Sequence, residues 1–234
     1  MALDLVGTVG QPQIAERVIL GQWLKNDTLR PIGLQVLKRH NFTCSNCGFA
    51  SRPSKQIPHG WMIPAGLRHP GLVPSPDAKC LCPMCVAPLA LNWSVISKKK
   101  KGQELQAPGM LIYCPWIIQR DLNVLASYSV AVKANCRVGR SSAIEAVVRS
   151  LDAAISALNE EVGSNTPIYR GKDSDFARSL ALLPSEYYRD RSELIGALRW
   201  WPNLDYWEQQ GLYWYQASTQ ALHKRFESIL EGLL

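Results

Sequence analysis

The arrangement of apolar and polar positions along this chain predicts where its helices and strands lie. Apolar residues return every three or four positions over long stretches, which is the pattern of amphipathic helices. The expected helices span Ile32–His40, Val86–Trp93, Ile117–Asn135, Ser141–Val162, Asp175–Leu183, Ser185–Trp200 and Tyr206–Leu234. A short continuous apolar run, Gly109–Tyr113, predicts a strand that Pro115 ends.

The first third of the chain gives shorter elements. The stretch LDLVGTV predicts a strand, and a helix is expected around Ala15–Leu24. Residues 26–28 offer an N-cap for the next helix, whose first turn suits Pro31. The prolines between Arg52 and Asp77 exclude a long helix there, and Gly60–Ile63 is the expected hairpin strand within that segment.

The composition is that of a globular protein. With 234 residues, 47% apolar and 19% charged, the chain can bury one sizeable core, which excludes general disorder and collagen. No apolar run of about 18 residues is present, and the N-terminus lacks a secretory h-region, so we expect a cytoplasmic protein without a membrane span.

The formal net charge is +7, and four lysines stand together at Lys98–Lys101. Such a run can hold nucleic acid, anionic lipid or an acidic protein segment, although most such runs are solvated linkers. The charge alone therefore does not select a partner.

The cysteines give the strongest chemical signal. Seven are present, and two CxxC pairs, Cys44/Cys47 and Cys82/Cys85, are separated by 34 residues. Each pair places two sulfurs on one tight turn, and two such turns supply the four thiolates of a tetrahedral zinc site. Four sulfur ligands leave no position for a substrate or water, so the expected role of this single zinc ion is structural.

Alternatives to this ligand set remain open from the residues alone. Cys80 could replace Cys82, although only Cys82 makes the two-residue spacing with Cys85. An iron–sulfur cluster would use the same ligands. A redox role is disfavoured because neither pair stands at the strand-to-helix junction of a thioredoxin-like βαβ unit. The isolated Cys114 and Cys136 are expected to fill core space.

The sequence thus predicts an α+β protein in which a zinc module packs against a mainly helical C-terminal half. We expect the module, an HNH-like or treble-clef-type unit with a short β-hairpin and a helix, to span residues 1–93. A basic linker is expected over residues 94–110, and the helical region over residues 111–234, the whole forming one continuous structural unit.

Two zinc knuckles around a hairpin, followed by a helix, resemble the scaffold of HNH endonucleases. That family needs further histidines or carboxylates to hold a catalytic metal with open positions. Here Val86 follows the second knuckle, His59 has no paired carboxylate beside it, and His69 stands alone. A nuclease, and a non-catalytic nucleic-acid-binding zinc module, are therefore alternatives rather than the main expectation.

Several segments in order are similar to the DotN/IcmJ family of type IVB (Dot/Icm) secretion systems. They are the helix leading into FTCSNCGF, the knuckle CPMC, the strand GMLIY, the SSA start of a long helix and the ALLPS turn. The resemblance covers about residues 1–200. It implies an HNH-like fold around a zinc ion held by Cys44, Cys47, Cys82 and Cys85, without nuclease catalysis.

The resemblance also implies partners and a location. Members of this family are adaptors that bind the C-terminal extension of the coupling ATPase DotL at the cytoplasmic face of the inner membrane. With the IcmS/IcmW chaperone pair they form a complex that receives effector substrates. Related conjugation systems carry a DNA–relaxase cargo, so a conjugation role is also open, while direct nucleic-acid binding is not expected.

Aromatic residues near the C-terminal end are candidates for the partner surface, because Trp, Tyr and Arg dominate binding hot spots. The candidates are Arg199, Trp200, Trp201, Trp207 and Trp214. The alternative is that these side chains fill the chain's own core. Melting and binding measurements on Trp207→Ala and Trp214→Ala separate the two.

Overall fold

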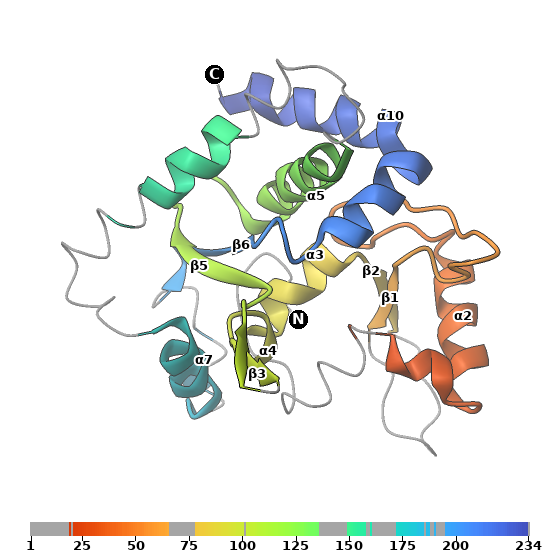
Figure 1. Cartoon of the computed structure of the whole chain (residues 1–234), viewed down its shortest axis with the longest axis horizontal. Helices are drawn as coiled ribbons and strands as arrows, with labels where there is room; N and C mark the ends of the chain where they lie inside the picture. Colours follow the sequence, from red (N-terminus) through yellow and green to blue (C-terminus); the bar gives the residue numbers. More distant parts are fainter. Residues whose placement is uncertain are drawn as a thin grey trace.

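The computed structural model describes residues 19, 21–65, 78–100, 102–135, 149–157, 160, 172–184, 186–187, 190 and 195–233 (Figure 1). Within these ranges the chain combines helices with three two-stranded antiparallel sheets. The prediction of a mixed helix-and-strand protein is therefore confirmed. The strand expected in LDLVGTV, half of the helix expected over 15–24, and His69 and Cys136 lie outside the described residues.

A small unit of short elements surrounds the cysteines. It comprises η1 (Gln22–Lys25), α2 (Leu29–Arg39), β1 (Ile63–Ala65), β2 (Lys79–Leu81), α3 (Pro83–Val86), η2 (Ala87–Leu89) and α4 (Leu91–Ser94). The side-chain oxygen of Asn26 accepts the backbone N–H groups of Thr28 and Leu29 at 3.0 and 2.9 Å, so Asn26 caps α2 as expected. β1 pairs with β2, with Ile63 opposite Leu81. The helix expected over 86–93 is present as three short pieces, α3, η2 and α4.

Two long helices form the centre of the C-terminal half. They are α5 (Gln119–Asn135) and α10 (Glu208–Leu233), and Figure 1 shows α10 curving past α5. The rings of Tyr128 and Phe226 stack between them with centroids 4.2 Å apart. Nearly all of α5 is buried, which explains why polar residues on this helix make specific internal hydrogen bonds.

A strand replaces the end of one predicted helix. The helix expected over 185–200 is wrong at its C-terminal end, because Leu198–Pro202 forms β6, with all five residues buried. β6 pairs antiparallel with β5 (Gly109–Tyr113), and Leu111 lies opposite Trp200. Aromatic residues suit a strand buried on both faces, and this pairing joins segments that are far apart in the sequence.

Further elements surround this sheet. The described part of the helix expected over 141–162, residues 149–157 and 160, is helical. In it, Asp152 accepts the indole N–H of Trp201 at 2.8 Å. The helix α7 (Asp173–Ala181) begins at Asp173, whose carboxylate accepts the Leu111 N–H at 2.7 Å.

The segment expected to be a loop-like basic linker contains a hairpin. β3 (Lys98–Lys100) pairs antiparallel with β4 (Gln103–Leu105) across a turn at Gly102, whose φ is +81°. Three of the four lysines therefore belong to a strand. The division of the chain into a module, a linker and a helical region remains a prediction.

Candidate metal centre

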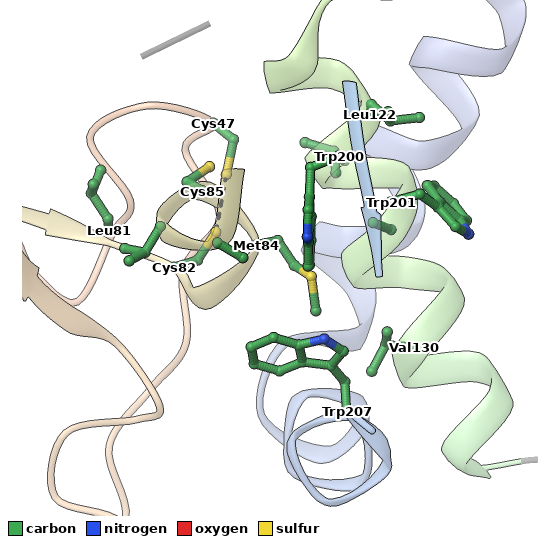
Figure 2. Packing of buried hydrophobic residues seen from close by; sticks show 14 of the residues in the cluster. Cys47, Leu81, Cys82, Met84, Cys85, Leu122, Val130, Trp200, Trp201 and Trp207 are labelled. Carbon is green, nitrogen blue, oxygen red and sulfur yellow. Dashed lines mark hydrogen bonds between the residues drawn. The ribbon is translucent and has the colours of Figure 1, made fainter. Parts of the chain in front are cut away.

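Four sulfur atoms from two distant segments meet at one point. The Sγ atoms of Cys44, Cys47, Cys82 and Cys85 all lie within 4.8 Å of one another, and each of these residues is at most 2% exposed. Figure 2 shows the Cys47 and Cys82 side chains directed toward each other, and their sulfurs are 3.7 Å apart. Sulfurs at about 2.3 Å from a tetrahedral Zn²⁺ ion are separated by about 3.8 Å, so the cluster has the dimensions of a zinc site.

The first pair is held by a tight hairpin. The N–H of Cys44 donates to the Phe49 carbonyl at 2.7 Å, and the N–H of Gly48 donates to the Cys44 carbonyl at 2.9 Å. Gly48 has a φ of +71°, which glycine adopts without steric cost. This turn directs the Phe49 N–H toward the Cys47 sulfur at 3.5 Å.

The second pair stands at the start of α3. Cys82 is extended and precedes the helix, and Pro83 occupies its first turn. The N–H of Cys85 donates to the Cys82 carbonyl at 3.0 Å, which brings the two sulfurs onto one side of the turn. The second CxxC motif therefore stands where β2 ends and α3 begins.

Cys80 is separate from the cluster. It lies on β2 opposite Pro64, and its carbonyl accepts the Ser45 N–H at 2.8 Å, which ties the second segment to the first knuckle. Burial raises the pKa of its thiol, with a further contribution from Cys44 and Cys47. The four-sulfur cluster contains Cys82 and not Cys80, and the assignment of Cys82 as a metal ligand remains a prediction.

The electrostatics of the cluster favour a bound cation. Hydrogen bonds from the Cys47, Cys82 and Cys85 thiols hold the pKa of Cys44 far below its usual range. Burial raises the pKa of Cys82 and of Cys85. Four thiolates cannot share this buried volume unless a cation offsets their charge, and a divalent metal ion supplies that charge.

Two amide side chains donate to the same sulfur. The Nδ2 of Asn123 lies 3.2 Å from the Cys85 Sγ, and the Nδ2 of Asn46 lies 3.6 Å from it. Neither Asn46 nor Asn123 is among the site residues predicted from the sequence. A signal was present for Asn123, because Gln119, Asn123 and Ser127 recur every four residues along one face of a helix that is largely buried.

The histidine considered for a nuclease site does not belong to the cysteine cluster and is surrounded by aromatic side chains. His59 packs edge-on against Trp23 and Trp61, with ring centroids 6.1 and 5.6 Å apart. Burial lowers its pKa from 6.5 to about 4. Across the described ranges, the four cysteines are the only group of three or more His, Cys, Asp or Glu side chains close enough to hold a metal ion.

The residues predicted to bind a partner are in the core instead. Arg199, Trp200, Trp201, Trp207 and Trp214 are all at most 5% exposed. Arg199 donates to the Ile117 and Leu198 carbonyls at 2.6 and 2.8 Å. The prediction that these five side chains form an exposed partner surface is therefore wrong, and they fill the chain's own core instead.

These aromatics connect the metal centre to the rest of the core. Figure 2 shows Met84 extending from α3 toward the indoles of Trp200 and Trp207. Those two rings meet edge to face with centroids 6.3 Å apart. On the first knuckle, Phe49 meets Trp214 of α10 with centroids 5.4 Å apart. The C-terminal half therefore packs against both knuckles.

Comparison with known proteins returns no match, either to a protein-family model or to a curated protein. None of the helices in the described ranges is both long enough and apolar enough to cross a bilayer.

Proposed function

We propose that this chain is a non-catalytic, zinc-containing adaptor with an HNH-like fold. In this proposal it belongs to a type IVB secretion or related conjugation coupling complex, where it binds the C-terminal extension of a DotL-like coupling ATPase. IcmS/IcmW-like chaperones would join the same complex at the inner membrane.

The observation that carries the non-catalytic part of the proposal is the composition of the four-sulfur cluster. A zinc ion held by Cys44, Cys47, Cys82 and Cys85 has a complete tetrahedral shell, so it can bind neither water nor a phosphate oxygen. When bound, the ion supplies folding free energy, on the order of 10–16 kcal/mol in small zinc modules.

The surroundings of His59 support the same proposal. A nuclease of the HNH type needs a histidine base beside a metal with open positions. His59 instead contacts two indoles, and within the described residues it belongs to no group of three or more metal-ligating side chains. The secretion-system part of the proposal rests on the ordered sequence segments given above.

The most direct test is a titration of the purified, zinc-loaded chain with the C-terminal extension of the coupling ATPase encoded in the same gene cluster. A peptide of the same composition in scrambled order is the control. We expect a stoichiometric complex with the authentic segment only, and modest sensitivity to salt. Absence of a complex with the authentic segment contradicts the adaptor proposal.

The same preparation tests the two alternatives. Cleavage of DNA with added Mg²⁺ or Mn²⁺ that disappears in His59→Ala would identify a nuclease. Binding of DNA with an affinity that falls steeply as salt rises would identify a nucleic-acid-binding module, because such binding releases counterions from phosphates. The adaptor proposal predicts neither result.

A further inference from the structure

A continuous chain of buried hydrogen bonds connects the β5–β6 sheet to the metal centre. The backbone N–H of Trp200 donates to Oε1 of Gln119 at 2.7 Å, and Nε2 of Gln119 donates to the Trp200 carbonyl at 3.1 Å. The same Nε2 donates to Oδ1 of Asn123 at 2.8 Å. Nδ2 of Asn123 then donates to Sγ of Cys85 at 3.2 Å.

The backbone N–H of Trp200 fixes the direction of every hydrogen bond in this network. A backbone N–H can only donate, so the Gln119 oxygen must face Trp200 and the Gln119 amide nitrogen must face Asn123. The Asn123 oxygen accepts that bond, which leaves its own nitrogen directed at sulfur. The network therefore sets both amide orientations, and it requires an acceptor at Cys85.

Burial makes this requirement strong. Gln119 is fully buried, Asn123 is 1% exposed and Cys85 is fully buried, so no member can exchange its partner for bulk water. A neutral thiol is a weak acceptor, whereas a metal-bound thiolate accepts N–H bonds well. A zinc ion with four thiolates carries a net charge of −2, and each N–H···S bond reduces the charge density on the sulfur that accepts it.

We propose that Asn123 is a positioning residue of the metal site and that Gln119 fixes its orientation. The zinc centre then extends beyond the two knuckles into α5 and β6, which links metal occupancy to the sheet of the C-terminal half. This inference rests on the zinc site of the proposed function and adds an outer shell to it.

The variant that tests the proposal is Asn123→Leu, which is nearly isosteric and cannot donate to sulfur. Ser127→Ala is the matched control, because Ser127 is equally buried one turn later on α5 and donates only to the Asn123 carbonyl, at 2.7 Å. Competition with a chelator measures the zinc affinity of each. We expect about 10- to 100-fold weaker binding for Asn123→Leu and at most about a twofold change for Ser127→Ala.

A spectroscopic readout separates this role from simple packing. In the cobalt-substituted protein, loss of the N–H···S bond returns electron density to Cys85 and moves the thiolate-to-cobalt charge-transfer band to lower energy. A residue that only packs would change the melting temperature and leave the band in place. Unchanged affinity and an unchanged band in Asn123→Leu would overturn the proposal.

A measurement on the wild-type protein remains decisive if the variant does not fold. In protein loaded with cadmium-113, a hydrogen bond to the metal-bound sulfur transmits a scalar coupling between the metal nucleus and the Asn123 side-chain amide protons. We expect this coupling at Asn123. A protein that binds cadmium without it contradicts the inference alone, whereas a protein that binds neither zinc nor cadmium contradicts the proposed function itself.

Discussion

The guanidinium of Arg225, on α10, occupies the space into which a side chain at Gly48 would project. A Cβ added to Gly48 would clash with Nη1 of Arg225 and lie 3.4 Å from its Cζ. Gly48 follows Cys47 in the first knuckle, so the C-terminal helix lies against the turn that positions this sulfur. Glycine suits this position because of its positive φ, and a larger residue would also require the Arg225 guanidinium to move.

Replacement of Gly48 by alanine tests this relationship. Gly102 is the matched control, because it also has a positive φ but has no atom within 4 Å of an added Cβ. Gly102→Ala should cost about 1–2 kcal/mol from the left-handed backbone alone. Gly48→Ala should cost only slightly more, as measured by chemical denaturation, because the Arg225 guanidinium is the end of a flexible side chain and can move aside. A loss larger by several kcal/mol in Gly48→Ala would show instead that Arg225 is held rigidly over this turn.

The two neighbouring cysteines of the second segment should behave differently. Cys82→Ser removes one of the four sulfurs, and we expect it to abolish stoichiometric zinc binding and to lower the melting temperature sharply. Cys80→Ser changes a buried thiol outside the cluster and should keep one zinc ion per chain. Elemental analysis of both purified variants checks this. Loss of zinc in Cys80→Ser, with retention in Cys82→Ser, would reverse the ligand assignment.

Two tryptophans provide a test of the core assignment. Trp207 is 1% exposed and contacts Trp93 and Trp200 edge to face, whereas Trp116 is 58% exposed. Trp207→Ala should lower the free energy of unfolding by about 3–5 kcal/mol. Trp116→Ala should change it by no more than about 0.5 kcal/mol. Normal stability of Trp207→Ala would contradict its place in the core.

Acid should destabilise the fold through His59. Burial lowers the pKa of His59 from 6.5 to about 4, so the unfolded chain binds a proton in this interval that the folded chain does not. The His59 contribution to stability is therefore complete above pH 6.5 and falls as the pH drops toward 4, by at most about 1.4 kcal/mol per pH unit. Protonation of the cysteine ligands adds its own acid sensitivity.

His59→Phe separates the two effects, because it keeps an aromatic ring and leaves the cysteines unchanged. The difference in unfolding free energy between wild type and variant should shrink or change sign as the pH falls from 6.5 to 4. A difference that is constant across this interval would show that His59 does not titrate abnormally.

The local part of the metal centre could be predicted from the sequence because it is encoded locally. A CxxC motif fixes two sulfurs through one turn, and Pro83 and Gly48 identify the turn on each side. The strand at Gly109–Tyr113 was predicted with its observed bounds for the same reason, since an apolar run and a proline define it.

The non-local part could not be predicted in this way. Leu198, Arg199 and Trp200 end a predicted helix, and they belong to a strand because β5 offers a partner far away in the sequence. Asn123 is separated from Cys85 by 38 positions, and only the packing of α5 onto α3 brings the two together. The lysine run has no apolar residues to indicate a strand, yet backbone pairing with β4 makes it one.

The central claim is that one metal ion is enclosed completely by the four clustered sulfurs. X-ray absorption at the zinc edge of the purified, unmodified protein tests it most directly. We expect one zinc ion per chain with a shell of four sulfurs at about 2.3 Å. A nitrogen or oxygen ligand in that shell, or protein that is folded without metal, would contradict it.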